Sequence, residues 1–140
     1  MVSLEQLPHP EYLPYPNHYT AAFFENGEEA LKAIEELEDY GYSDEDFNVF
    51  EGNKGVDAID LEGSHHTLLE NYMRKFIKFS DSAEWRFLHE ADQEIRNGHV
   101  LICVPTPSSK EKEEVVDAFK RYGGYDIRYF TPLYIEEVVL

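Results

Sequence analysis

Basic residues are scarce in this sequence. Its 140 residues hold 12 Lys and Arg against 29 Asp and Glu, a formal net charge of −17. A charge of this sign disfavours nonspecific attraction to nucleic acid or anionic lipid. Residues 25–62 contain fourteen Asp and Glu but only Lys32 and Lys54, so one side of the fold is expected to be strongly negative. This is typical of a solubility surface, and an acidic face that docks on a basic protein partner is the alternative.

Cysteine and long apolar runs are also nearly absent. The single cysteine, Cys103, excludes an intrachain disulfide, and its place in the run "HVLICVP" predicts a buried thiol rather than a nucleophile. No apolar run approaches about 18 residues, and no Lys or Arg precedes Lys32. We therefore expect neither a membrane helix nor a secretory signal, and a cytoplasmic location.

Sequence motifs for catalysis are missing as well. The chain has no G-x-S-x-G, no phosphate-binding glycine loop and no H-E-x-x-H. We expect a protein that is not an enzyme and that carries no cofactor.

The chain has enough apolar residues for one folded domain, which we predict over residues 19–140. Hydrophobic residues make up 42% of the sequence and include nine Phe and ten Tyr. Residues 1–18 differ, because Pro8, Pro10, Pro14 and Pro16 forbid a helix and favour an extended arm. The sequence leaves open whether this arm lies on its own domain, lies on a neighbouring subunit or is a free tail.

Two strand-helix-strand units follow from the pattern of apolar residues. In the first, "YTAAFF" predicts a strand, Asn26 and Glu29 have capping spacing at the start of a helix, and Gly41 ends that helix before the strand "FNVFEG". In the second, "HVLICVP" precedes a helix with Ser108 and Glu111 in the same spacing. A last strand lies in "YDIRYFTPLYIEEVV", bent or broken at Pro132. The inward stripes of the two helices are Ala30, Ala33, Ile34, Leu37 and Val115, Val116, Phe119, Tyr122.

These two units are a degenerate internal duplication. A shift of 82 positions places Leu37 and Gly41 on Phe119 and Gly123. A shift of 80 positions places Phe47, Val49 and Phe50 on Ile127, Tyr129 and Phe130. Two such units favour an α+β, ferredoxin-like sandwich with a four-stranded antiparallel sheet and both helices on one face. The open face of that sheet, rich in Tyr and Phe, would pair copies into a homodimer or higher oligomer.

The segment 53–98 is predicted to be inserted between the second and third strands as a helical hairpin. Its inward residues would be Leu68, Leu69, Tyr72, Met73, Phe76, Trp85, Leu88, Ala91 and Ile95. The basic cluster "MRKFIK" is expected to be the solvated face of the first helix, and contact with the acidic half of another copy is the alternative.

The sequence resembles the general stress protein 17M-like, or heat-induced stress protein, family. The stretches that carry the resemblance are "AAFFENGEEALKAIEELEDYGYSDEDFNVFEG", "GVDAIDLEGSHHTLLENYMRKF", "YMRKFIKF", "EWRFLHEADQEIRNGHVLICV" and the closing strand-helix-strand unit, within residues 19–131. The resemblance implies a ferredoxin-like fold and a stress-linked role in bacteria. It implies no enzymatic activity and no functional residues. The Pro-rich arm lies outside it, and the aromatic, charged helical pair replaces a glycine-rich central segment of some members.

One group of residues has metal-ligand chemistry. His66 and Glu70 are four residues apart, on one face of a predicted helix, and imidazole and carboxylate ligands suit zinc, iron or manganese. The residues favour an ordinary helix N-terminus, with Asp57 and Asp60 in a loop, because no complete ligand motif is present. A metal or small-molecule site is the alternative, and its candidate residues are His65, His66, Glu70 and His89.

Overall fold

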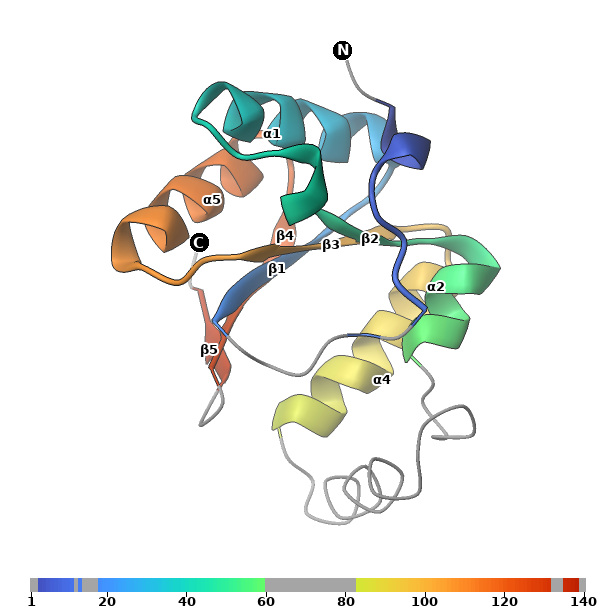
Figure 1. The fold of residues 1–140 in the computed structure, drawn as a ribbon. Coiled ribbons are helices and arrows are strands. Elements are labelled where there is room, and N and C mark those ends of the chain that lie inside the picture. The colour runs from blue at the N-terminus through green and yellow to red at the C-terminus, as the bar shows by residue number, and fades with distance from the viewer. Residues whose placement is uncertain (1–2, 12, 14–17, 60–82, 132–134, 139–140) are drawn as a thin grey trace.

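The computed structural model describes residues 3–11, 13, 18–59, 83–131 and 135–138 and shows an α+β fold (Figure 1). The strands are β1 (Tyr19–Phe24), β2 (Asn48–Phe50), β3 (Val100–Pro105), β4 (Tyr125–Phe130) and β5 (Ile135–Glu137). The α-helices are α1 (Gly27–Asp39), α2 (Gly52–Ile59), α4 (Ala83–Arg96) and α5 (Ser109–Arg121). Short 3₁₀ helices are η1 (Leu4–Gln6) and η2 (Asp44–Asp46).

The sheet is antiparallel and has five strands in the order β2-β3-β1-β4-β5. The expected four strands are therefore joined by a fifth, because β4 ends at Phe130 and the chain returns as β5 to pair with it. Pro132, where a break was predicted, lies outside the described residues. Each helical crossover skips one strand, since β3 lies between β1 and β2 and β1 lies between β3 and β4.

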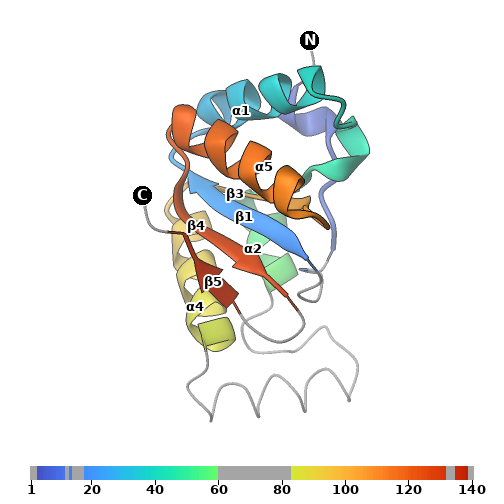
Figure 2. The same cartoon turned by 90° about the vertical axis from the view of Figure 1, so that its left-hand side faces the viewer.

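Helices α1 and α5 cover one face of the sheet, as predicted. Their inward residues pack with Ala22 and Phe24 of β1 and with Val100, Ile102 and Val104 of β3. Figure 2 shows the two helices side by side on this face. The predicted stripes are buried except for Tyr122, which follows α5 and is half-buried. Burial of this apolar surface accounts for both helix positions.

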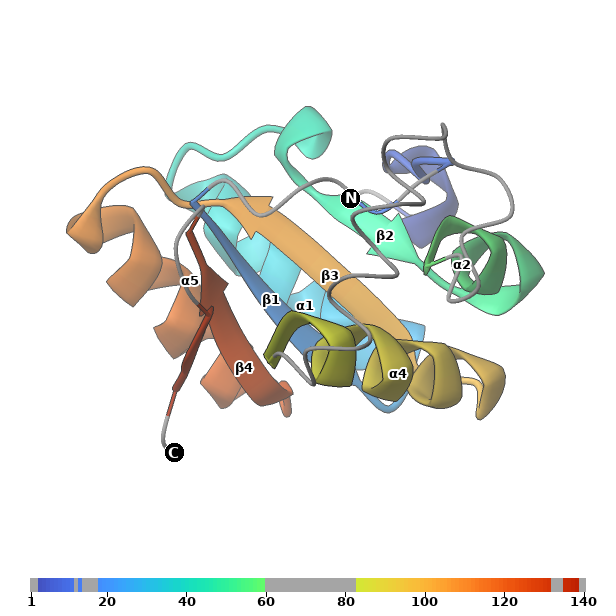
Figure 3. The same ribbon diagram turned by 90° about the horizontal axis from the view of Figure 1, so that it is seen from below.

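The opposite face is covered too, which corrects the expectation of an open aromatic face. Helices α2 and α4 pack there, and Figure 3 shows α4 lying beneath the central strands. Alternate residues of β1, Tyr19, Ala21 and Phe23, point to this side, and Phe87 of α4 contacts Phe23 and Phe130. Because both faces are covered, all six residues of β1 are buried. A homodimer would have to use another surface.

The described partner of α4 is α2, which the sequence did not predict. Residues 64–76, expected to form the first helix of the hairpin, lie outside the described part. In α4, the predicted inward residues Leu88, Ala91 and Ile95 are buried, and the side chain of Trp85 is not described. Gly55 lets α2 pack tightly, because a Cβ there would lie 2.9 Å from the backbone carbon of Phe50 and 3.1 Å from Cγ2 of Ile95. Asp57, expected in a loop, is in α2 and exposed.

The amino-terminal arm lies on its own domain. Leu4 and Leu7 are buried in the core beneath α1 and β2. The Val49 amide of β2 donates to the Pro8 carbonyl at 2.9 Å, and the Leu13 amide donates to the Ala58 carbonyl at 2.9 Å. Within this single chain, packing and backbone hydrogen bonds thus place residues 4–11 and 13 on their own domain.

The internal duplication is visible in the backbone. Helices α1 and α5 each have 13 residues and begin 82 positions apart, at Gly27 and Ser109. Each is followed by a glycine with positive φ, Gly41 at 107° and Gly123 at 87°. This conformation favours glycine, so both helices end in the same way.

Candidate functional site

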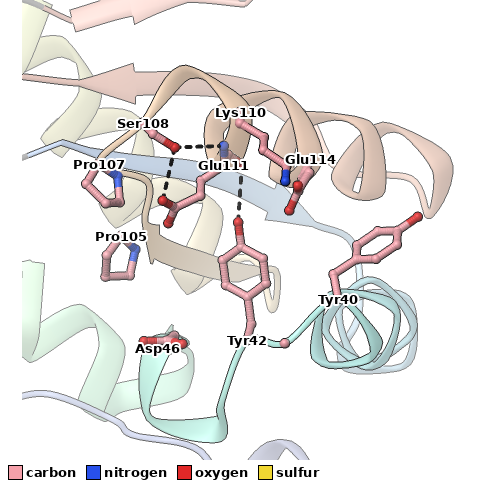
Figure 4. A pocket seen from close by; sticks show the side chains of 10 residues that line it. Tyr40, Tyr42, Asp46, Pro105, Pro107, Ser108, Lys110, Glu111 and Glu114 are labelled. Carbon is pink, nitrogen blue, oxygen red and sulfur yellow. Dashed lines mark hydrogen bonds between the residues drawn. The ribbon is translucent and has the colours of Figure 1, made fainter.

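A pocket of about 480 Å³ lies where the connection from α1 to β2 meets the start of α5 (Figure 4). The two segments are far apart in sequence, and each supplies one wall. The residues that line the pocket are Tyr40, Gly41, Tyr42, Asp46, Pro105, Pro107, Ser108, Lys110, Glu111 and Glu114.

The first wall is built by local hydrogen bonds after α1. The Tyr42 amide donates to the Leu37 carbonyl at 3.2 Å, which turns the chain at Gly41. In η2 the Asp46 carboxylate accepts from the Ser43 amide at 2.9 Å, so its position is set by a capping interaction. The Tyr42 ring packs on Phe47, with centroids 6.3 Å apart, and its hydroxyl donates to the Glu111 carbonyl at 3.4 Å.

The second wall is the N-terminus of α5. Ser108 is the predicted cap: its Oγ accepts from the Glu111 amide at 3.2 Å and donates to the Glu111 carboxylate at 3.0 Å. Pro105 and Pro107 hold the chain extended before the helix, because proline has no amide hydrogen and a fixed φ. The hydroxyl of Ser108 is therefore committed to the helix, and the prediction that it is a cap is confirmed.

The pocket joins aromatic rings with negative charge. Three carboxylates, Asp46, Glu111 and Glu114, line it with one amine, Lys110. Tyr40 is 60% exposed. Burial, together with the charges of Glu114 and Glu111, raises the pKa of Tyr42 to about 12. Tyr42 therefore stays neutral near pH 7, where it offers a ring face and a hydroxyl but not a phenolate.

Only one half of the duplicated fold has this pocket within the described residues. Between Gly41 and Phe47 the chain is two residues longer than between Gly123 and Ile127, and it includes η2. In the second half Gly124 stands where Tyr42 stands in the first, and a Cβ on it would lie 2.8 Å from the Phe119 carbonyl oxygen. Glu29 packs against Gly123: its Oε2 lies 2.9 Å from the position that a Cβ on Gly123 would occupy. At the equivalent place in the second half, Glu29 and the Phe119 carbonyl lie close to Gly123 and Gly124 and leave little room there.

Of the four candidate metal ligands, the described structure includes His89 alone. His65, His66 and Glu70 lie outside it, as do Asp60 and Glu62. His89 is on the exposed side of α4, where its Nε2 is 3.4 Å from Nε2 of Gln93. Among the described residues there is no group of three His, Cys, Asp or Glu side chains that could hold a metal ion. A site on the four predicted residues stays a prediction, which elemental analysis of protein purified without an affinity tag would test.

A cluster of three polar side chains joins α4 to the sheet, and the sequence did not indicate it. The Tyr125 hydroxyl donates to the Glu94 carboxylate at 3.0 Å and lies 2.7 Å from Nδ1 of His99, which also contacts Glu94. Burial and the bond to Glu94 raise the pKa of Tyr125. Glu94 is in α4, Tyr125 is in β4 and His99 directly precedes β3, so no local spacing pattern relates all three.

Cys103 is buried in β3, as predicted. Its side chain faces α2 and α4, and burial raises the pKa of the thiol. A neutral thiol in the core is a poor nucleophile.

Three searches for relatives gave no match. No family model matches the chain, and no match was found among curated proteins or among solved structures. As a separate finding, none of the helices in the described residues is long and apolar enough to cross a membrane.

Proposed function

We propose that the protein is a non-enzymatic binding module whose pocket takes a cationic side chain, Lys or Arg, of a basic protein partner. The observation that carries this proposal is the joining of Tyr40 and Tyr42 with three carboxylates in the pocket of one half of the fold. The charge of the chain had already suggested, as an alternative, an acidic face that docks on a basic protein partner.

The chemistry of the lining suits a cation. An ammonium or guanidinium group is attracted to the face of a tyrosine ring and to carboxylates. Asp46 and Glu114 come from opposite walls, so a basic side chain that enters the pocket would have a carboxylate on each side. The net charge of −17 adds long-range attraction, which speeds encounter with a basic partner and weakens as salt is added.

The same lining favours binding over catalysis. The Ser108 hydroxyl is engaged by Glu111, and the Tyr42 hydroxyl has a raised pKa and bonds a backbone carbonyl. Neither group is poised as a nucleophile or base near neutral pH.

The proposal also covers the fold assignment, the cellular role and the assembly of the protein. We propose a ferredoxin-like assignment for the fold, supported by the order β2-β3-β1-β4 and by α1 and α5 on one face. We also propose a stress-linked regulatory role in the cytoplasm, and the resemblance to the heat-induced stress protein family supports the stress-linked part of it. Assembly into a homodimer is also proposed and is developed below.

The experiment is a titration of ¹⁵N-labelled protein with a short Lys- and Arg-containing peptide, followed by amide chemical shifts. We expect shifts at residues 40–46 and 108–114, and binding that weakens with salt. Tyr40→Ala and Glu114→Gln should each weaken binding by roughly fivefold or more. Glu113→Gln is the matched control, because Glu113 is exposed on the same helix and does not line the pocket. Equal loss in all three variants, or shifts spread over all acidic residues, would reject the pocket as the site.

A further inference from the structure

The edge strand β2 is covered by the chain's own arm. β2 has three residues and pairs with β3 on one side only. On its other side the Val49 amide bonds the Pro8 carbonyl. Unpaired edge strands tend to pair with other chains, and a cover of this kind prevents it.

The arm covers the β2 edge through its side chains and does not form a sixth strand. Pro8 and Pro10 have no amide hydrogen, so the arm cannot continue the ladder. Its affinity for the body comes instead from side chains. Leu4 and Leu7 enter the core on one side of the sheet, and Leu13 packs on the other side. These anchors therefore lie on both sides of the sheet, and Figure 1 shows the arm running past β2 toward α2.

His9 adds a polar latch to these contacts. Its Nδ1 is 2.7 Å from the Leu7 carbonyl oxygen, and its Nε2 is 2.9 Å from the Glu51 carboxylate. Glu51 directly follows β2, so the latch lies at the end of the covered strand. The arm thus makes a specific set of contacts with the rest of its chain. A second copy of the chain offers the same contacts to the same arm.

The point where the arm joins β1 is strained. His18, the residue before β1, has φ of 57°, in the left-handed region that non-glycine residues rarely adopt. It is held there by the Thr106 amide, which donates to its carbonyl at 2.8 Å, and by the Tyr129 hydroxyl, 3.0 Å from its Nδ1. The sequence just before it contains Pro14 and Pro16. Strained hinges favour exchange of a terminal segment between copies, since exchange can relieve the strain while keeping the contacts.

We propose that two copies of this chain exchange their arms, so that residues 4–11 and 13 of each copy cover the β2 edge of the other. The partner surface is then the open edge of β2, and the occupant is the same arm, with its leucines and prolines. The exchanged dimer keeps the contacts of Leu4, Leu7, Pro8 and His9 and differs at His18. The two acidic copies repel each other, so the dimer is favoured by added salt.

Light scattering over a concentration series measures this equilibrium in the full chain. We expect a dimer fraction that rises with protein concentration and with salt. His18→Gly removes the strain in both copies and should weaken dimerisation by roughly tenfold to thirtyfold. Tyr129→Phe is the control, because it removes the bond to His18 without freeing the backbone, and it should not weaken dimerisation. A protein that stays monomeric, or a dimer unaffected by His18→Gly, would overturn the proposal.

A second measurement separates arm exchange from association through another face. Dimers are formed from a mixture of ¹⁵N-labelled and ¹³C-labelled copies, and isotope-filtered proton contacts are recorded. Arm exchange predicts contacts between the Val49 amide of one copy and Leu7 or Pro8 of the other. If those contacts occur only within a copy, the dimer uses another surface and the proposal is wrong.

Discussion

Asn26 and Ser108 hold the same position in two copies of one structural unit, 82 residues apart. The Asn26 side chain accepts from the Glu29 amide at 2.9 Å, and Ser108 accepts from the Glu111 amide at 3.2 Å. Each bond satisfies an amide at the start of a helix that has no partner within the helix. The two caps therefore set the starts of α1 and α5, and the second also sets the pocket wall.

Loss of either cap should destabilise the fold. We expect Asn26→Ala and Ser108→Ala each to lower the free energy of unfolding by about 1 kcal/mol, measured by urea denaturation. Lys32→Ala, at an exposed position in α1, should change it by less than about 0.5 kcal/mol. If Ser108→Ala left the free energy of unfolding unchanged, the hydroxyl would not stabilise the start of α5 as a cap.

Gly55 should not tolerate a side chain. Alanine has a higher helix propensity than glycine, but its Cβ would lie 2.9 Å from the backbone carbon of Phe50. Relief of that clash would require the backbone of β2 to shift. We expect Gly55→Ala to destabilise the protein by about 1–2 kcal/mol. The exposed neighbour Lys54→Ala is the control, and thermal or urea unfolding is the measurement. A stabilised Gly55→Ala variant would contradict the tight packing of α2.

Glu38 should make the protein less stable as the pH rises. Burial, a hydrogen bond with Asp44 and the charges of Asp44 and Glu35 raise its pKa from 4.5 to about 7. The folded state thus favours the protonated form, and the stability it contributes is complete below pH 4.5 and lost by about pH 7.

Glu38→Gln should remove this loss. The variant is expected to be more stable than the wild type at pH 8 by about 1 kcal/mol, a value reduced for solvent screening, and nearly equal to it at pH 4. Urea unfolding at several pH values measures the difference. Glu113→Gln should show no such crossover, and parallel curves for wild type and Glu38→Gln would contradict the prediction.

Tyr125→Phe should loosen α4. The change removes the hydroxyl that bonds Glu94 and His99 but keeps the ring that packs near Phe23. We expect a loss of about 1–2 kcal/mol and faster amide exchange in α4. Tyr40→Phe, at the exposed ring beside the pocket, is the control and should leave both unchanged.

Cys103 should be inert in the folded protein. Its burial and raised pKa keep the thiol neutral and out of reach of reagents. A thiol reagent should react promptly in denaturant but not in native buffer, whereas an added Lys54→Cys thiol should react in both. Fast native labelling of Cys103 would mean that β3 opens readily.

Some features followed from local signals alone. The helices α1 and α5 were predicted with their caps and buried stripes, because cap spacing and 3.6-residue periodicity act within a few residues. Strands β1, β2, β3 and β4 were predicted from short runs of apolar, β-branched and aromatic residues, which are also a local signal. The buried thiol followed from its apolar neighbours.

Other features were decided only by the tertiary structure. A segment with Gly52 and Gly55 has low helix propensity, yet α2 forms because it packs on β2 and α4. The pocket joins Tyr42 to Glu111, and the cluster at His99 joins three elements, so no sequence spacing reveals them. The sequence by itself determined where α1 and α5 begin and which face of each helix is buried. The folded chain decided which distant residues meet, since those contacts depend on how both faces of the sheet and its β2 edge are covered.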